Sequence, residues 1–347
     1  MVVLSADAER CLISDVLTAL HVPPAGAASV ADDLVEADLR GHDSHGLGRL
    51  NMQVDNLRAG RVDAAAQPRL VHEQAGAIVV DGCRALGPPT IDFALDLAAE
   101  HAQQHGSCTA AIRNHGYIAY LGRYVERTLE RDCICILLGK SKGNVHPWGG
   151  LLPLVGSNPI AAAIPTEDEP LLVDMSTGTA AMGKILEAIR TGEGIPSNWA
   201  VDEQGRPTSD PLAARRGALS PLGGAKGYAL GLLVELLAAV LPGGDSGSRR
   251  QDANLWSALA IVLHVPSFAE PAAFRRQTSA FLESLKESPK APGFDEILVP
   301  GERTYRTRRE RLQSGIPHPD ETWRSASAYC RDLNLEPGRY LSPTSAS

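Results

Sequence analysis

The chain has 347 residues, of which 44% are hydrophobic and 21% charged, and its 33 basic and 41 acidic side chains leave a formal net charge of −8. This length exceeds the usual size of one compact core, so two domains are expected. The negative balance gives no support for a nucleic-acid partner or an anionic membrane surface.

The first seventy residues are predicted to be helical. Ser5 can cap a helix that begins at Ala6, and a second helix with an apolar stripe ends at Gly41. From about Gly76 the pattern changes to α/β, with a helix over Ile91–His105. Apolar runs broken by Gly, Pro and Asn predict strands over Ala77–Val80, Thr109–Ile112, Cys133–Leu138, Ile160–Ile164 and Leu171–Val173.

Helices are predicted to resume after Gly223. Gly227–Leu241 is almost entirely apolar, which indicates a buried helix, and Pro266–Leu285 has a weaker amphipathic pattern. Residues 242–250 have the composition of a mobile loop, and the tail 342–347 is predicted to be disordered. These patterns predict an α+β fold, with mainly helical residues 1–74 and 226–347 and a central α/β segment over 75–225.

The cysteines and the N-terminal residues give an expectation for the cellular compartment of the protein. Six cysteines form no CxxC pair, and Cys133 and Cys135 would share one face of a strand, so buried free thiols are expected rather than a disulfide or metal site. The first 20 residues carry charges, and no later stretch of about 18 residues is apolar without a charge, so neither a signal peptide nor a membrane span is expected. We expect a cytoplasmic protein.

One polar segment follows the second predicted helix. It runs over Arg40–Gly46 and is followed by Arg49. An arginine can bind a carboxylate through two hydrogen bonds, and Ser44 with His45 can donate a proton to a carbonyl or imine. Composition alone also fits a plain capping loop.

Three further segments are candidates for chemistry. His115 and Tyr117 follow the strand over Thr109–Ile112, where catalytic groups are common. The turn-rich segment 146–159 permits a ligand to approach the backbone. Lys226 lies where a glycine-rich loop opens a helix, a place suited to a phosphate or carboxylate. The chain has no GxGxxG after a strand, so a standard Rossmann loop would not hold a dinucleotide.

These segments, in this order, resemble the malate/L-lactate dehydrogenase-like oxidoreductases, which include ureidoglycolate dehydrogenases, sulfolactate dehydrogenases and cyclic imino-acid (piperideine and pyrroline carboxylate) reductases. The resemblance is carried by ADLRGHDSHGLGRL, PWGGLLPLVGSNPIAAAIP, VDMSTG, GKILEAIRTGEGIPSNWAVDEQGRPTSDP and GALSPLGGAKGYALGLLVELLA. It implies a homodimer, a helical substrate and dimerisation domain, a central cofactor domain of non-Rossmann fold, and NAD or NADP between them. It also implies hydride transfer to or from a small 2-oxo, 2-hydroxy or 2-imino carboxylic acid.

The resemblance also assigns residues. Ser44, His45 and Arg49 fall on the loop at the substrate end, where the arginine would bind the substrate carboxylate. The positions that match cofactor contacts in the family are Ser141, Asp174, Met175, Ser176, Lys226, Gly301 and Glu302.

One position departs from the family pattern. Where family members read like RNxGHxGxLG, with the histidine as general acid and base, this chain reads RNHGYIAYLG and places Tyr117 there. His115, Tyr117 or His45 would then move the proton. A tyrosine is a poor base at neutral pH but can donate a proton, and an imine, which arrives protonated, needs less help than a ketone. We therefore expect a mild preference for imine reduction. The alternatives are an orthodox 2-hydroxyacid dehydrogenase that uses His115, or an altered member that binds or consumes a nicotinamide nucleotide.

Overall fold

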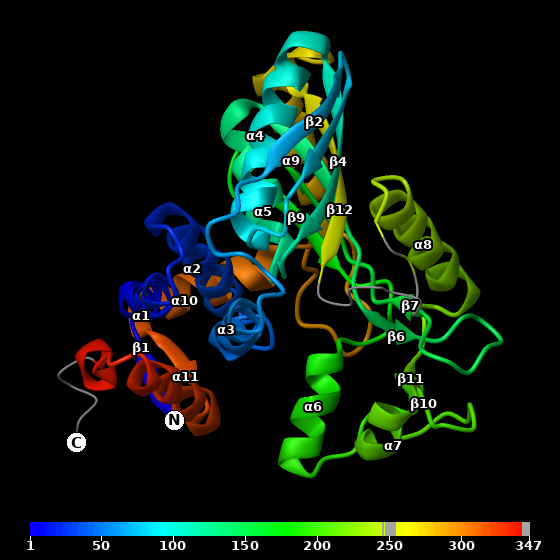
Figure 1. The fold of residues 1–347 in the computed structure, drawn as a ribbon. Coiled ribbons are helices and arrows are strands. Elements are labelled where there is room, and N and C mark those ends of the chain that lie inside the picture. Colours follow the sequence, from blue (N-terminus) through cyan, green and yellow to red (C-terminus); the bar gives the residue numbers. More distant parts are fainter. Residues whose placement is uncertain (245, 247–254, 342–347) are drawn as a thin grey trace.

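The computed structural model describes residues 1–244, 246 and 255–341. Figure 1 shows a tall central sheet with helices along it, a group of terminal helices beside its lower end, and a small α/β lobe on the other side. The described helices are α1 (Ala6–Ala19), α2 (Pro24–Leu39), α3 (Leu50–Arg58), α4 (Gly87–His105), α5 (Leu121–Arg127), α6 (Met182–Thr191), α7 (Pro211–Arg216), α8 (Ala225–Glu235), α9 (Pro271–Lys286), α10 (Glu302–Ser314) and α11 (Asp320–Asp332).

The central sheet has seven strands in the order β2-β3-β4-β12-β5-β8-β9. Their bounds are β2 (Arg69–Gln74), β3 (Ala77–Asp81), β4 (Ser107–His115), β12 (Trp256–His264), β5 (Cys133–Gly139), β8 (Ile160–Ile164) and β9 (Leu171–Met175). Strands β3 and β4 pair in parallel, and the other neighbouring strands of this sheet are antiparallel. A Rossmann sheet is mostly parallel, so the expected non-Rossmann α+β fold is confirmed.

Helices cover both faces of this sheet. Helices α4 and α5 pack against one face and close an apolar core that includes Ile91, Leu95 and Tyr124. The segment that contains α8 and the π-helical turn Leu236–Val240 packs against the other face through Val234 and Ala238. Figure 1 shows α8 on the side of β12 away from α4 and α5.

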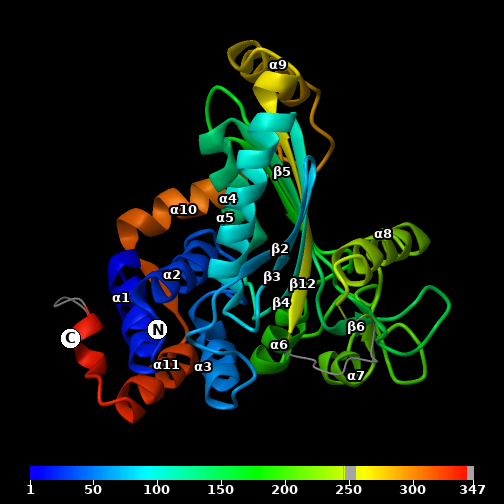
Figure 2. The same cartoon turned by 45° about the horizontal axis from the view of Figure 1, so that its top comes forward.

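The two ends of the chain form one helical unit. Strand β1 (Val2–Leu4) pairs antiparallel with β13 (Ile316–His318), and α1, α2 and α11 share an apolar core. In Figure 2 the blue N-terminal helices lie directly beside the red C-terminal ones. The small lobe contains a second sheet, β10 (Ala200–Val201), β11 (Ala218–Leu219), β6 (Gly143–Val145) and β7 (Val155–Gly156), with α6 and α7.

Several local predictions are confirmed. The Ser5 hydroxyl accepts a hydrogen bond from the Ala8 N–H at 3.1 Å, and Gly41, with φ of +79°, follows the end of α2. The five predicted strands are β3, β4, β5, β8 and β9. Cys133 and Cys135 are both fully buried free thiols on β5. No helix in the described ranges combines the length and the apolar character needed to cross a bilayer.

Two predictions about the C-terminal part are wrong. Residues 256–264, expected in a mainly helical segment, form β12 in the middle of the sheet, because its apolar residues are covered on both faces. The helix over Gly227–Leu241 is not wholly buried: Leu233 and Leu236 are 51% and 55% exposed. Uniform apolarity does not reveal which face another element covers. Most of the loop over 242–250 and the tail 342–347 lie outside the described residues.

Candidate active site

A cavity of about 660 Å³ opens between the helical unit and the central sheet. Loops that follow α2, β4 and β5 form its walls, together with the end of β9 and the start of α6. These segments lie far apart in the sequence, and several of the predicted site residues come together where they meet. We refer to this cavity as the cleft.

The segment His42–Arg49, here called the substrate loop, forms one wall. The Ser44 hydroxyl and His45 Nδ1 lie 2.9 Å apart, and Arg49 Nε donates to the Ser44 carbonyl at 2.6 Å. This second bond fixes the guanidinium at the cleft, where Arg49 and His45 both line the surface. Burial lowers the pKa of His45 to about 4, and the Arg49 charge adds to this effect, so the imidazole is neutral at pH 7.

The substrate loop also packs tightly against α6. A Cβ on Gly183 would lie 2.4 Å from the Ser44 Cβ, so only glycine fits beside the serine. Gly183 is the second residue of α6 and lines the cleft. Met182 lines it as well. The contact fixes the position of the serine relative to the small lobe.

The structure brings Tyr117 to the cleft and leaves His115 outside it. Tyr117 lines the cleft, and its ring meets the edge of Trp256 with centroids 5.4 Å apart. Burial raises the pKa of Tyr117 far above its ordinary value, so the phenol keeps its proton. His115 is the last residue of β4 and is fully buried. Its Nδ1 lies 2.8 Å from the Gly116 carbonyl oxygen, and its Nε2 has no hydrogen-bond partner among the described residues. Burial lowers the pKa of His115 to about 4.

Four predicted cofactor residues also line the cleft. Ser141 follows β5, and Asp174, Met175 and Ser176 lie at the end of β9. The Ser141 and Ser157 hydroxyls lie 3.1 Å apart. Asp174 accepts a hydrogen bond from the Gly122 N–H at 2.8 Å, and burial raises the pKa of its carboxyl group to about 7.

The other three predicted cofactor residues lie outside the cleft. Lys226 is exposed in the first turn of α8. Gly301 precedes α10 with φ of +103°, and Glu302 accepts a hydrogen bond from the Val299 N–H at 3.0 Å and pairs with Lys286. Within this chain these three residues lie at the starts of α8 and α10 and not at the cleft.

Two residues that line the cleft, Lys140 and Trp256, were not singled out from the sequence, whereas His42 belongs to the candidate segment Arg40–Gly46. His42 stacks on Tyr120 with ring centroids 4.9 Å apart, and burial lowers its pKa to about 4. Lys140 directly follows β5, where its position at a strand end could have identified it. Trp256 could not have been found, because its segment was not recognised as a strand.

The residues present fit a nicotinamide dinucleotide. The volume lies within the range of about 300–1,000 Å³ that small-molecule and cofactor sites occupy. Lys142, Ser141 and Ser176 supply the positive charge and hydroxyl donors that phosphates and ribose need. Asn144 Oδ1 is buried without a hydrogen-bond partner among the described residues, so it can accept one from a ligand. These residues would hold the cofactor in the cleft.

Comparison with known proteins gives the class of this chain, the NAD(P)-dependent oxidoreductases. The chain belongs to the malate/L-lactate dehydrogenase family, which it matches over residues 4–326. It is 33% identical to the solved sulfolactate dehydrogenase of Methanocaldococcus jannaschii, with a TM-score of 0.91 and coverage of 97% of this chain and 99% of that one.

Two other relatives differ in their named reactions. The (2R)-3-sulfolactate dehydrogenase (NADP(+)) of Chromohalobacter salexigens is 36% identical, over 86% of this chain and 89% of that protein. The solved delta1-piperideine-2-carboxylate reductase of Pseudomonas syringae is 29% identical, with a TM-score of 0.84, over 95% of this chain and 100% of that one. The predicted family is therefore confirmed, and its dehydrogenases use NAD or NADP.

Proposed function

We propose that this enzyme reduces a small 2-imino or 2-oxo carboxylic acid with NADH or NADPH, and that it prefers the imine. Arg49 binds the substrate carboxylate, because its guanidinium is fixed by the Ser44 carbonyl and faces the cleft. The cofactor supplies the hydride when it is bound. The sulfolactate dehydrogenase and piperideine-carboxylate reductase relatives support a substrate of this class.

The observation that carries the preference is that Tyr117, and not His115, lines the cleft. A ketone needs a proton at its oxygen as hydride adds to carbon, whereas a cyclic imine is basic enough to bind already protonated. In the resting enzyme Tyr117 is a neutral phenol, which can donate a proton to a reduced ketone but has no free base form to accept one from an alcohol, and this favours reduction over oxidation. His45, neutral and paired with Ser44, is the second group that can move a proton.

A panel of substrates tests this proposal. The purified protein is mixed with NADH or NADPH and then with pyruvate, oxaloacetate, sulfopyruvate, piperideine-2-carboxylate or pyrroline-2-carboxylate, and absorbance is followed at 340 nm. We expect the cyclic imino acids to give the highest kcat/KM. Much faster turnover of a 2-oxo acid would instead favour a 2-hydroxyacid dehydrogenase that uses His45 or a displaced His115. Cofactor binding without turnover would favour a protein that binds or consumes the nucleotide.

We propose further that the chain forms a homodimer through the exposed face of α8 and the turn after it. Leu230, Leu233 and Leu236 are 40%, 51% and 55% exposed there, and such an apolar surface is costly to leave in water. Analytical ultracentrifugation should give twice the mass of the 36.8 kDa chain, and Leu233→Glu should shift the protein toward monomer. A monomeric wild type would contradict this proposal.

We also propose a cytoplasmic location. All six cysteines are free thiols, as expected in a reducing compartment.

A further inference from the structure

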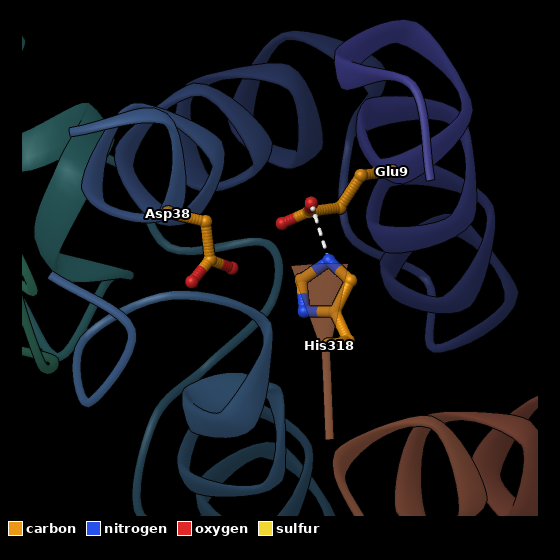
Figure 3. A group of neighbouring side chains, drawn as sticks. All are labelled: Glu9, Asp38 and His318. Carbon is orange, nitrogen blue, oxygen red and sulfur yellow. Dashed lines mark hydrogen bonds and ion pairs between the residues drawn. The ribbon is translucent and has the colours of Figure 1, made fainter. Parts of the chain in front are cut away.

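A group of three titratable side chains adjoins the substrate loop outside the cleft. Glu9 of α1, Asp38 of α2 and His318 of β13 point toward one another, as Figure 3 shows. They are 0%, 2% and 2% exposed, and their ligand atoms all lie within 4.8 Å of one another. His318 Nε2 lies 3.0 Å from Glu9 Oε2. We call this group the triad.

Asp38 connects the triad to the substrate loop. Its Oδ2 accepts a hydrogen bond from the Leu47 N–H at 2.6 Å. A Cβ on Gly46 would lie 1.9 Å from the Asp38 Cγ, so the loop backbone rests directly on the carboxyl group. Leu47 and Gly46 lie between His45 and Arg49, and the carboxyl of Asp38 therefore sets the turn that aims both side chains.

The two carboxyl groups of the triad need a proton between them. Both are buried and close together, and two neighbouring buried carboxylates cannot both be charged without a large cost. Glu9 Oε1 is buried and has no hydrogen-bond donor among the described residues when both groups are ionised. A proton on Asp38 supplies that donor, while the other oxygen of Asp38 still accepts from Leu47.

We propose that Asp38 is held as a carboxylic acid that donates to Glu9, and that this shared proton positions the substrate loop. Asp38 and Glu9 are then positioning residues that act through Ser44, His45 and Arg49. The role of the loop in catalysis rests on the proposed function, whereas the shared proton does not. A divalent cation is the other occupant that three such ligands could take, and the test below distinguishes it.

The charges around the triad agree with a shared proton. Burial raises the pKa of Glu9 to about 7, and burial together with the Glu9 charge raises the pKa of Asp38 well above its usual range. The other charged groups that face the pair are Arg10 of α1, Asp43 of the substrate loop, Arg311 of α10 and His318 of β13. Arg311 donates to the Asp38 main-chain carbonyl and pairs with Asp43, so it does not neutralise the buried carboxyl group.

The pH dependence of stability follows from these raised values. The unfolded carboxyl groups ionise near pH 4, whereas the folded pair keeps its proton to higher pH. The contribution of the pair is therefore fully present below about pH 4 and is lost as the pH rises through the raised values. Asp38→Asn copies the protonated acid, because its amide can donate to Glu9 while its oxygen accepts from Leu47.

The test measures urea unfolding of wild type and Asp38→Asn from pH 6.5 to 8.5. We expect the ratio of their folding equilibrium constants, variant over wild type, to rise at least about fourfold over this range, since one proton corresponds to about tenfold per pH unit until the folded pair loses it at its raised pKa. The neutral histidines of the cleft are common to both proteins and cancel in the ratio. Glu9→Gln, which also removes the shared proton, should give the same rise and serves if Asp38→Asn folds poorly.

Asp33→Asn is the matched control. Asp33 lies on the same helix and is fully buried, but its two oxygens accept from the N–H groups of Ala119 and Tyr120 at 2.8 and 3.2 Å, so an amide fits poorly. Burial raises the pKa of Asp33 to about 6, so this variant should be destabilised by a constant factor above pH 6.5. A flat ratio for both triad variants would overturn the proposal. So would one metal ion per wild-type chain, detected by plasma mass spectrometry and lost in Asp38→Asn.

A kinetic readout then tests the effect on the loop. If the enzyme reduces a 2-imino or 2-oxo acid, Asp38→Ala should raise the KM for the acid at least about tenfold and leave the KM for the cofactor unchanged, because the substrate loop alone is released. Asp38→Asn should keep both KM values. If Asp38→Ala leaves the KM for the acid substrate unchanged, the positioning role is overturned. If the wild-type enzyme shows no turnover, the proposed function fails, but the unfolding test still decides whether the proton is shared.

Discussion

Replacement of Arg49 by alanine should raise the KM for the acid substrate by about two to three orders of magnitude. The guanidinium is held at the cleft by the Ser44 carbonyl and is the group that can bind a carboxylate through two charged hydrogen bonds. Each such bond contributes about 1.5–3 kcal/mol, so the loss of the pair is large. Steady-state kinetics with the preferred substrate of the panel would measure it.

Two variants make the result specific. Arg49→Lys keeps the charge but not the planar fork, so it should restore only part of the affinity. Arg58→Ala removes a half-exposed arginine from the same region, where Arg58 pairs with Asp332 outside the cleft, and it should leave the KM unchanged. An unaltered KM in Arg49→Ala would show that the carboxylate binds elsewhere.

Replacement of Tyr117 by phenylalanine should separate ketone from imine reduction. We expect the rate with a 2-oxo acid to fall about 10²- to 10⁴-fold, the usual contribution of a positioned proton donor. The rate with a cyclic imino acid should fall less than about tenfold, because that substrate brings its own proton. Rapid mixing with a saturating cofactor concentration would measure the chemical step for both. Equal losses with the two substrates would mean that Tyr117 is structural, through its contact with Trp256.

Tyr117→His and Tyr120→Phe complete this comparison. A histidine at position 117 would place an imidazole where the family has its acid and base, so we expect faster ketone reduction and alcohol oxidation relative to imine reduction. Tyr120 also lines the cleft and stacks on His42, and loss of its hydroxyl should change neither rate by more than about threefold. If Tyr117→His leaves the rate of ketone reduction relative to imine reduction unchanged, His45 is the better candidate for proton transfer.

Local interactions explain which parts of the fold were predictable. The Ser5 cap, the stop at Gly41 and the strands of the central segment depend on neighbouring residues, so they are visible in a short window of sequence. The resemblance to the family likewise located Arg49, His45 and Tyr117, because it rests on short ordered motifs.

Distant contacts explain what was missed. Strand β12 lies in a part of the chain that was expected to be mainly helical, and its place between β4 and β5 depends on pairing with residues more than 100 positions away. The way in which the sheet, the small lobe and the helical unit meet decides which residues line the cleft. It brings Lys140 and Trp256 to the cleft and leaves Lys226, Gly301 and Glu302 outside it. None of these positions has a local signal that distinguishes a cleft from a surface.

Residue identity and short motifs were sufficient to predict a non-Rossmann α+β oxidoreductase with a tyrosine in place of the usual histidine, because both can be read along the chain without knowledge of its packing. Tertiary structure alone decided that Tyr117 faces the cleft while His115 is buried outside it. It also decided that Glu9 meets His318, 309 residues away, beside the carboxyl group that supports the substrate loop. Such contacts arise only when the two chain ends pack together and exclude water from their polar groups.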